Sequence, residues 1–523
     1  MSPAAAPSVP GTLTIPYAGL MTTDPDPSAV PLAGDVTGPQ VIPAPEVRGV
    51  PRVGRAWRVR AQMAVRGVGP PTVAIGIPGG DDAVSQRHAR AVIDLALRVG
   101  EAMLSTGASA SEVVATVLRL VGAYGISSAH VDITFTSITI SIQRGLDEDP
   151  LAVLRVMRVR TLDYTRLQNV QRLVDQIAQP RAGEQVPEPD EARDRLADIL
   201  SAPHPYRRWI VSGGGALLAV GVVALFGAGP LMWLIAAVTA LIVDQTQRWL
   251  SRLEVAAFFN QAVSAAIPTL VAVVIFWMRS RGWELPGVDS PSLVVISGII
   301  LLLAGLTVMG AAQDAIDGYY VTAGARGLEM FMLTLGLAVG VATVLGLAWR
   351  LGIPMEISPY VSVGGSPLQS TFAAAAIGAG FAWSTYTGFR ATLLAAAVAA
   401  GSWVVYELLF PLGLGVGGAV VLPAAVVGAV AYAAHRMLRV PELAIVMAGI
   451  VPLLPGLSVY RAIFLMMDNT ALLPAAAEAL FNALSIGIGL AAGVWIGQYL
   501  ARRRFGLDAA AQLARNRSRG APR

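Results

Sequence analysis

An apolar stretch late in the chain, Gly449 to Val459 (GIVPLLPGLSV), has the residue types of a transporter binding site. Pro452, Pro455 and Gly456 interrupt this stretch inside a segment long enough to cross a membrane. A proline removes a backbone N–H, and in lipid the carbonyl groups left unpaired are tolerated only where protein or a water-filled cavity receives them. Such carbonyls and amides can bind the ammonium and carboxylate groups of a small zwitterion. We therefore expect part of a substrate site here.

A similar stretch occurs 151 residues earlier in the chain. Gly298 to Val308 (GIILLLAGLTV) has the same residue as the later stretch at seven of eleven positions, and Thr307 aligns with Ser458, so that either hydroxyl could bind a hydroxyl of the substrate. Interrupted segments at corresponding places in two halves of a chain are the best sequence indication of a transporter's binding site. The predicted substrate site comprises Leu303, Ala304, Gly305, Thr307, Pro452, Pro455, Gly456 and Ser458.

Two further polar residues, Asn260 and Gln261, lie inside another apolar segment and are also candidate substrate ligands. A polar side chain in hydrocarbon costs several kcal/mol unless it has a partner or is hydrated. The two amides could equally hydrogen-bond between helices and serve packing alone. Arg461, just after the later interruption, could bind a substrate carboxylate or anchor the segment at the outer membrane interface.

Acidic residues in or beside the apolar segments are candidates for carrying a coupling proton, because desolvation raises the pKa of a carboxyl group toward neutrality. Asp314 and Asp317 lie three residues apart on one helix face in AAQDAIDGYY, and we assign the coupling proton to one of them. Glu329 and Glu478 lie at corresponding places in the two halves, and Asp244 lies near the inner end of its segment. These last three residues could instead be solvated at the membrane interface.

The composition indicates the class of protein that must position these residues. Of 523 residues, 54% are hydrophobic and 14% are charged, and the mean hydropathy is +0.60. Soluble domains carry roughly 25% charged residues, so this profile indicates a mostly α-helical polytopic membrane protein. The chain has no cysteine, which excludes disulfides, thiolate nucleophiles and cysteine-based metal sites. We expect neither a metal nor a cofactor.

Ten apolar segments have the length needed to cross roughly 30 Å of hydrocarbon. They cover residues 209–227, 229–246, 255–277, 292–314, 326–349, 369–386, 389–410, 414–434, 442–466 and 474–500. Residues 203–352 and 353–500 would then form two halves of five helices each. Because five crossings return the chain to the opposite side, the second half must lie upside down relative to the first, as an inverted repeat. Pro268 and Pro423, in the third and eighth segments, form a second, looser correspondence.

The distribution of arginine sets the expected topology. Eleven arginines fall on one side of the predicted segments and four on the other. The eleven are Arg207, Arg208, Arg248, Arg252, Arg326, Arg390, Arg436, Arg439, Arg502, Arg503 and Arg504, and the four are Arg279, Arg281, Arg350 and Arg461. The positive-inside rule then places both chain termini in the cytoplasm, with residues 501–523 as a basic tail.

The first part of the chain differs in composition from the rest. Residues 1–83 are rich in Pro, Ala, Gly, Ser and Thr and show little hydrophobic periodicity, which predicts a disordered tail. No positively charged region precedes an apolar core there, so we expect no cleavable signal peptide. An arginine cluster at 48–66 could contact anionic lipid, but a solvated tail explains it, and we expect no nucleic-acid partner.

Residues 84–202 have the pattern of a small α+β domain. Apolar positions at helical spacing predict a helix that stops at Gly107, and Ser109 with Glu112 forms a capping box that starts a second helix ending near Gly125. Two further helices are expected, at about 163–177 and 190–201. This domain would pack against the membrane part or against a second copy in a homo-oligomer.

The strands of this domain are predicted from alternating apolar residues. In HVDITFTSITISI the alternation slips by one position at Thr136 and Ser137. We interpret the slip as a bulge or bend in one long strand over 131–142, because a bulge inserts one residue and changes the side that later residues face. A second strand is expected at 153–159.

The same domain contains residue types that a hydrolase would use, namely Ser137, His88, His130, Asp132 and Asp163. No nucleophile elbow, phosphate-binding loop or metal-ligand spacing surrounds them. His204 lies in HPYRRW at the membrane entrance, where aromatic residues and arginine are expected for interfacial reasons alone. We therefore expect structural roles for these residues and no enzymatic activity, with a membrane-tethered hydrolase as the rival hypothesis.

Five stretches carry a resemblance to a known family. They are DLALRVGEAMLSTGASASEV, VDITFTSITIS, RVRTLDYTRL, GAAQDAIDGYYVTAGAR and GIVPLLPGLSVYRA. In this order, over roughly residues 85–500, the chain resembles the threonine/serine exporter family of bacterial membrane proteins. The resemblance implies a cytoplasmic N-terminal domain, ten crossings of the plasma membrane, and export of small hydroxy amino acids driven by the proton motive force. In relatives the two halves occur as separate proteins associated with dicarboxylate export.

The sequence thus predicts a secondary exporter that exchanges threonine or serine for protons by alternating access. A dicarboxylate exporter is one alternative, and it would need strong positive charge near the membrane midplane, where only Arg461 is a candidate. A channel is another, and its flux would not respond to collapse of the proton gradient.

Overall fold

The computed structural model describes residues 85–519, apart from short gaps. The gaps are 127, 144–148, 158–161, 181–184, 284–287, 289–290, 303–304, 354, 356–363, 439, 457, 460, 463–464 and 466–472. The predicted tail at 1–83 and the backbone at Leu303 and Ala304 lie outside the described residues.

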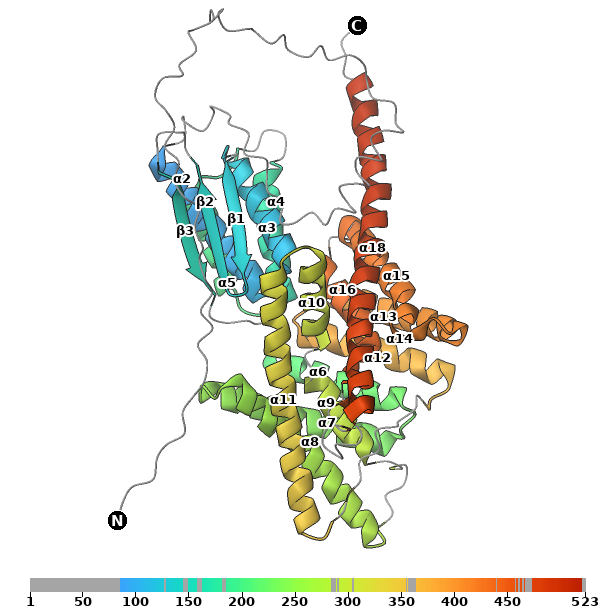
Figure 1. Ribbon diagram of the computed structural model, residues 1–523. Coiled ribbons are helices and arrows are strands. Elements are labelled where there is room, and N and C mark those ends of the chain that lie inside the picture. The colour runs from blue at the N-terminus through green and yellow to red at the C-terminus, as the bar shows by residue number, and fades with distance from the viewer. Residues whose placement is uncertain are drawn as a thin grey trace, which may run out of the picture. The chain divides into compact units, whose positions relative to one another are not determined.

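Residues 85–201, which we call the αβ segment, form a three-stranded antiparallel sheet and four helices (Figure 1). The helices are α2 (Gln86–Ser105), α3 (Ala110–Ala123), α4 (Tyr164–Ala178) and α5 (Pro189–Ser201). The strands, in the spatial order β1-β2-β3, are β1 (Ala129–Thr134), β2 (Ser137–Ile142) and β3 (Leu151–Val156). The four predicted helices are confirmed, and Ser109 and Asp163 cap α3 and α4 as their positions before the apolar runs indicate.

The prediction of one long strand with a bulge is wrong. Phe135 and Thr136 form a two-residue turn between β1 and β2, and Thr134 pairs with Ser137. Phe135 has a φ of 52°, the left-handed conformation that tight hairpin loops require. The apolar alternation slips because the chain reverses direction there. The next strand, β3, begins at Leu151, two residues before the predicted start.

The helices that follow correspond to the predicted membrane segments. In residues 203–352, which we call the N-half, they are α6 (Arg208–Leu225), α7 (Pro230–Arg252), α8 (Ala257–Ser280), α9 (Ser292–Leu302), α10 (Gly305–Ile316) and α11 (Tyr320–Arg350). From residue 353 onward, which we call the C-half, they are α12 (Pro367–Ser384), α13 (Phe389–Leu409), η2 (Phe410–Leu412), α14 (Gly415–Ala419), α15 (Val421–Leu438), α16 (Glu442–Ile450), η3 (Val451–Leu453) and α18 (Leu473–Arg519).

Within the described part of the chain, seven helices are long and apolar enough to cross a membrane. They include α6, α7, α8, α11 and α13, together with the segments 415–438 and 473–504. The sixth predicted segment corresponds to the helix α12, which is not among the seven. The fourth segment corresponds to the shorter helices α9 and α10, and the ninth contains the shorter helices α16 and η3.

The helices pack in the same order within the two halves. In the N-half α6 contacts α7, α7 contacts α8, and α8 contacts both α9 and α11. In the C-half α12 contacts α13, α13 contacts α15, and α15 contacts both α16 and α18. Gly298 on α9 packs closely against α8, and Gly449 on α16 packs closely against α15. The halves meet along α6 and α12, whose backbones approach closely at Gly214 and Gly380. This repeated packing agrees with the internal repeat in the sequence.

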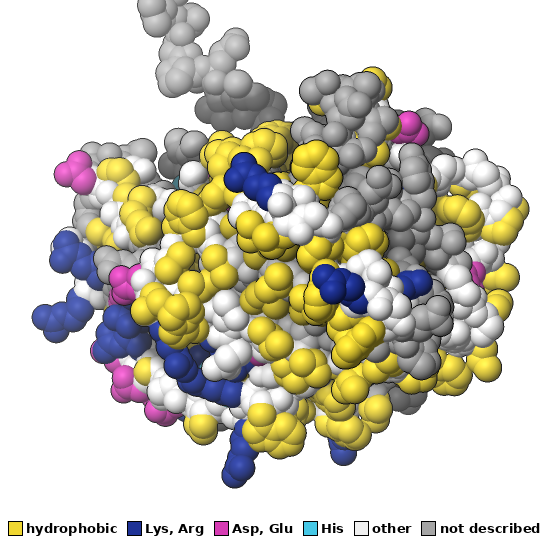
Figure 2. Space-filling model, turned by 90° about the horizontal axis from the view of Figure 1, so that it is seen from below, with side chains coloured by type: hydrophobic (Ala, Val, Ile, Leu, Met, Phe, Trp, Pro, Cys, Tyr) yellow, Lys and Arg dark blue, Asp and Glu magenta, His cyan; other side chains and the backbone are white. Residues whose placement is uncertain are grey.

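The outer surface of these helices is apolar. Large hydrophobic side chains on several helices are more than half exposed, among them Trp249, Phe259, Leu347, Phe372 and Phe481. Figure 2 shows hydrophobic side chains over much of one face, with arginines at separate positions on it. Exposed apolar area of this extent suits contact with lipid tails rather than water, so the fold is that of a polytopic membrane protein.

Candidate functional site

The later of the two predicted interruptions is a break in a helix, because the ninth segment leaves α16 through the 3-10 turn η3. In the fourth segment α9 ends at Leu302 and α10 begins at Gly305, and the two residues between them lie outside the described part of the chain. Leu454, which follows η3, is extended, with a ψ of 147°. Protein encloses this second break, because Val451, Leu453, Pro455 and Gly456 are all buried. Such enclosure is what irregular backbone requires at membrane depth.

Side chains from neighbouring helices bind backbone carbonyl oxygens near the ends of α9 and α16. The Gln261 side chain on α8 donates a hydrogen bond of 2.6 Å to the carbonyl oxygen of Leu302, the last residue of α9. The Ser402 hydroxyl on α13 donates a hydrogen bond of 2.7 Å to the carbonyl oxygen of Gly449, near the end of α16. Gln261 and Ser402 are both buried. The sequence indicated Gln261 as polar inside an apolar segment, but it gave no signal for Ser402, since single serines are common in packed helices.

The other predicted substrate ligands have different surroundings. Gly305 begins α10, and Ser458 lies partly buried in the helical turn after the second break. Pro452 lies in η3, where its ring accounts for the loss of the α-helical pattern. Asn260 links α8 to α7, because its side-chain nitrogen donates to the Gln247 carbonyl oxygen at 3.4 Å and to the Ser251 hydroxyl at 3.2 Å. The side chain of Thr307 lies outside the described residues.

Asp314, on the last turns of α10, is fully buried and forms an ion pair with Arg326 of α11. The Oδ2 atom of Asp314 lies 2.7 Å from Nη1 of Arg326, whose side chain is 13% exposed. The Oδ1 atom accepts a hydrogen bond of 3.3 Å from the backbone N–H of Ala110 in the αβ segment. A charge pair this well buried is strongly coupled, since each charge depends on the other for compensation. Sequence spacing indicated Asp314 but not its partner Arg326.

Asp317, beyond the end of α10, contacts the next residue of the αβ segment. Its Oδ2 atom accepts a hydrogen bond of 2.6 Å from the Ser111 hydroxyl. Burial raises the pKa of Asp317, while the Ser111 hydrogen bond and the Arg502 charge oppose that rise. Burial likewise raises the pKa of the neighbouring Tyr319 phenol to about 12, with Asp317 as the next cause. The two predicted carboxylates therefore bind one short stretch of α3 together.

The β1–β2 hairpin makes a second contact with the N-half. The hydroxyl of Thr322, on the first turn of α11, donates to the Ile133 carbonyl oxygen at 3.0 Å and accepts from the backbone N–H of Phe135 at 3.1 Å. Phe135 is the residue with positive φ in the hairpin turn. Strained backbone that is held by specific hydrogen bonds is typical of functional contacts.

The N-terminus of α4 binds the C-half at the connection between α12 and α13. The backbone N–H of Tyr164 donates to the Thr385 carbonyl oxygen at 3.2 Å, and the Thr165 hydroxyl donates to the Tyr386 carbonyl oxygen. His204 lies 2.8 Å from Asp163 and stacks on the Tyr386 ring at a centroid distance of 4.3 Å. His204 thus has a packing role at this contact, where the sequence indicated only a membrane-entrance position.

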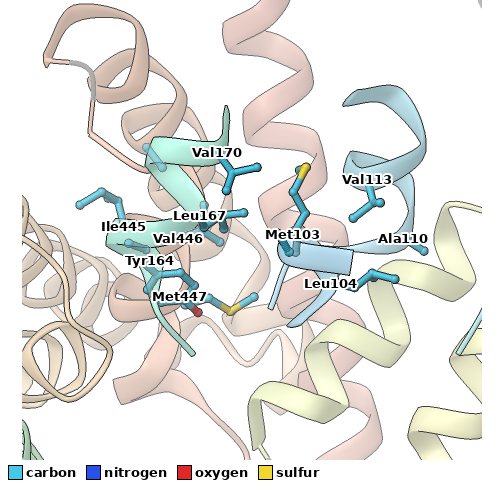
Figure 3. Close-up of a cluster of buried hydrophobic side chains, with 14 of the residues drawn as sticks. Met103, Leu104, Ala110, Val113, Tyr164, Leu167, Val170, Ile445, Val446 and Met447 are labelled. Carbon is cyan, nitrogen blue, oxygen red and sulfur yellow. The ribbon is translucent and has the colours of Figure 1, made fainter. Parts of the chain in front are cut away.

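An apolar cluster extends this contact into the C-half. Tyr164 and Leu167 of α4 belong to the same buried cluster as Ile445, Val446 and Met447 of α16 (Figure 3). Tyr164 is 1% exposed and Leu167 is fully buried. The αβ segment therefore packs against the membrane part, as one of the two predicted arrangements requires, and it does so on both halves.

The remaining predicted acidic residues lie apart from this contact. Asp244 forms an ion pair with Arg248 one turn along α7, and Glu329 is partly buried in α11. Glu478 is exposed near the start of α18. A further carboxylate, Glu407 on α13, accepts hydrogen bonds from Ser370 at 2.7 Å and Trp403 at 2.8 Å. Glu407 was not among the predicted site residues, although an acidic residue inside the apolar run VVYELLF indicates a functional position.

The hydrolase residue types are dispersed. Ser137 donates to the Thr134 carbonyl oxygen in the hairpin, and His88 makes an edge contact with the ring of Tyr124. Asp132 accepts from the Thr134 hydroxyl, and His130 is exposed on the outer side of β1. Asp163 caps the N-terminus of α4 and contacts His204. The described ranges contain no group of three or more His, Cys, Asp or Glu placed to hold a metal ion.

Comparisons with known proteins agree with this architecture. A model described as "Putative threonine/serine exporter" matches residues 94–348, and one described as "Threonine/Serine exporter, ThrE" matches residues 369–500. The chain is 34% identical over 469 residues to a "Probable threonine/serine exporter" of Mycobacterium tuberculosis, covering 85% of this chain and 83% of that protein. It is 32% identical over 453 residues to a "Threonine/serine exporter" of Corynebacterium glutamicum, covering 85% and 89%. No solved structure matches the chain.

The class of protein follows from the apolar helices, the buried break after α16 and these matches. The chain is a multi-pass membrane transporter. It belongs to the threonine/serine exporter family.

Proposed function

We propose that the protein is a secondary active exporter of threonine and serine, that it resides in the bacterial plasma membrane, and that it exchanges its substrate for protons. Two observations support the substrate class: the names of the family and of its relatives, and the helix break after α16. Unwound backbone in a membrane interior offers both carbonyl and amide groups, which suit the ammonium and carboxylate of a zwitterion. The buried break after α16 is the single observation that carries the proposal.

The breaks would form the substrate site between the halves. Gly305 and Gly456 leave room for substrate to approach the backbone, and Thr307 and Ser458 would bind its hydroxyl group. Gln261 and Ser402 hold the ends of α9 and α16 through their carbonyl oxygens, so they would position the breaks rather than touch substrate. The inverted arrangement of two five-helix halves would let one half rock against the other for alternating access.

Asp314 is our candidate for the coupling proton, with Asp317 beside it. A proton on Asp314 would remove the charge that Arg326 compensates, and it would weaken the hydrogen bond from Ala110. Proton binding would therefore loosen both the α10–α11 pair and the contact of the αβ segment with the N-half. With both termini in the cytoplasm, the αβ segment would lie at the cytoplasmic end of the transport path. Glu329, Glu478 and Asp244 remain secondary candidates.

Counterflow in proteoliposomes tests the proposed substrate class. Vesicles loaded with unlabelled threonine should accumulate labelled threonine and serine, and they should not accumulate labelled succinate. Accumulation of succinate in place of the amino acids would favour a dicarboxylate exporter. Threonine flux that is indifferent to a proton gradient and shows no counterflow would favour a channel. Hydrolysis of esters or peptides by the purified full-length protein, abolished by Ser137→Ala, would favour the membrane-tethered hydrolase.

A further inference from the structure

Glu112 lies on the first turn of α3, and its side chain makes a different contact from the one that a capping box predicts. The Ser109 hydroxyl accepts from the backbone N–H of Glu112 at 3.3 Å, as a capping box requires. The Glu112 carboxylate, however, accepts a hydrogen bond of 2.6 Å from the Gln171 side chain on α4. The carboxylate is therefore held between α3 and α4.

A second carboxylate, Glu442, lies across this boundary on the first turn of α16. Its Oε1 atom is buried and has no hydrogen-bond partner in the described part of the chain, while Gln498 of α18 hydrogen-bonds to the carboxylate. Leaving a buried charged oxygen without a donor is costly, whereas a proton bound to the carboxyl group removes that charge. No sequence pattern indicated Glu442, because an acidic residue at a helix start is ordinary.

The charges around the two carboxylates do not balance when both are ionised. Arg502 of α18 acts on both, and it is held over the ring of Tyr432 at 5.7 Å. Arg119 also acts on Glu112, but it forms an ion pair with Asp175 at 2.9 Å. His435 of α15 acts on Glu442, and its Nδ1 atom lies 3.0 Å from the Val440 carbonyl oxygen. Two carboxylates and Arg502 carry a net charge of −1, and one bound proton brings that charge to zero.

The direction of the pKa shift of Glu112 agrees with one bound proton at these carboxylates. Burial is the largest cause that raises the pKa of Glu112, to about 7, and the Glu442 charge is the second. Arg502, the Gln171 hydrogen bond and Arg119 oppose the rise. Tyr164, the other titratable group beside Glu112, has its pKa raised by burial and remains a neutral phenol.

We propose that Glu112 and Glu442, beside Arg502, form a site that binds one proton and that this proton holds the αβ segment against the C-half. The site lies outside the Asp314–Arg326 pair, and it joins the αβ segment to the other half of the molecule. When the proton leaves, the two carboxylates repel each other across this contact, so the contact between α3, α4 and α16 opens and water enters.

The direction of the pH effect follows from linkage. The closed contact binds the proton more tightly than the open one, in which an exposed glutamate has a pKa of roughly 4.3. Closure is therefore most favoured at low pH and weakens as pH rises toward about 7. The closure constant should be about tenfold smaller at pH 8 than at pH 6. If the proposed exchange for protons holds, closure at low cytoplasmic pH would stop an exporter that imports protons.

Spin-label distances in the full-length protein test this site. The chain has no native cysteine, so labels can be placed on Gln176→Cys in α4 and Met437→Cys in α15, both at exposed positions. In lipid nanodiscs without substrate, the short-distance population should fall as pH rises from 6 to 8. Glu442→Gln should move the midpoint to lower pH, and Arg502→Gln should move it to higher pH. Glu112→Gln should keep the contact closed throughout.

A control separates this site from other titrating groups. Glu191→Gln, on the exposed side of α5, should keep the parental midpoint. A distance distribution that does not change between pH 6 and 8, or equal midpoints in Glu442→Gln, Arg502→Gln and the parent, overturns the proposal. Because no substrate is present, this outcome is independent of whether the protein exports threonine.

Discussion

The αβ segment contacts the two membrane halves through different chemistry. On the N-half it donates hydrogen bonds to Asp314, Asp317 and Thr322. On the C-half it buries Tyr164 and Leu167 in an apolar cluster with α16. Water can replace hydrogen bonds, so each contributes only about 0.5–1.5 kcal/mol net, whereas buried apolar area loses its full transfer free energy when exposed, about 25 cal/mol per Å².

This difference indicates which contact opens more easily. The polar contact with the N-half can exchange its partners for water at small cost, and it includes the predicted coupling residue Asp314. The apolar contact with the C-half is the more durable one, and in our proposal it opens only when Glu112 and Glu442 lose their proton. We therefore expect the αβ segment to stay with the C-half while the N-half moves.

The largest expected effect is at the polar contact. Asp314→Asn should reduce gradient-driven threonine transport more than tenfold but leave counterflow intact, because the substrate path remains while the proton carrier is lost. Transport in proteoliposomes with and without an imposed proton gradient measures both activities. Asp190→Asn, which removes an exposed ion pair with Arg193 within α5, is the matched control and should keep both. Parental activity of Asp314→Asn in both assays would remove Asp314 from the mechanism.

The next largest effect is at the apolar contact. Tyr164→Ala should lower the free energy of unfolding by about 3 kcal/mol, because it removes a fully buried aromatic ring and leaves a cavity between α4 and α16. Chemical or thermal unfolding of the detergent-solubilised protein measures this loss. Tyr320→Ala, which removes a side chain that is 73% exposed, should change stability little. Equal effects of the two substitutions would show that the buried cluster contributes nothing specific.

A smaller effect is expected where a side chain binds the second break. Ser402→Ala leaves the Gly449 carbonyl oxygen without its donor, so we expect a loss of about 1–2 kcal/mol and a weaker apparent affinity for threonine. Counterflow at several threonine concentrations measures the affinity. Ser251→Ala removes a hydroxyl that donates within α7, and it should leave the affinity unchanged. An unaltered affinity in Ser402→Ala would argue against a substrate site at this break.

The smallest effect is expected at a single hydrogen bond to the N-half. Ser111→Ala should weaken this contact by about 1 kcal/mol and raise the pKa of Asp317 further, because the lost hydrogen bond favours the ionised form. Infrared titration of the carboxyl band, with Asp317→Asn to assign it, measures the change. The band should disappear at higher pH in Ser111→Ala than in the parent. A shift to lower pH would show that Ser111 stabilises the neutral acid.

Most elements of this fold were predictable from local patterns. The capping box at Ser109 and the apolar periodicity located helices of the αβ segment, because capping and amphipathicity act within one helix. The prolines at 452 and 455 located the second break for the same reason. The hairpin at Phe135 was missed, because a slip in alternation is equally consistent with a bulge and with a two-residue turn, and no Gly or Asn marks the turn.

The sequence by itself determined the class of protein and the position of the second break, since these follow from composition and from backbone chemistry along one segment. Only the tertiary structure decided that Asp314 pairs with Arg326 and that Ser402 binds the Gly449 carbonyl oxygen. It also brought Glu112 within electrostatic reach of Glu442, across more than 300 residues of chain. Such pairs depend on which helix faces pack together, and helix packing is set by many weak contacts that no short stretch of sequence contains.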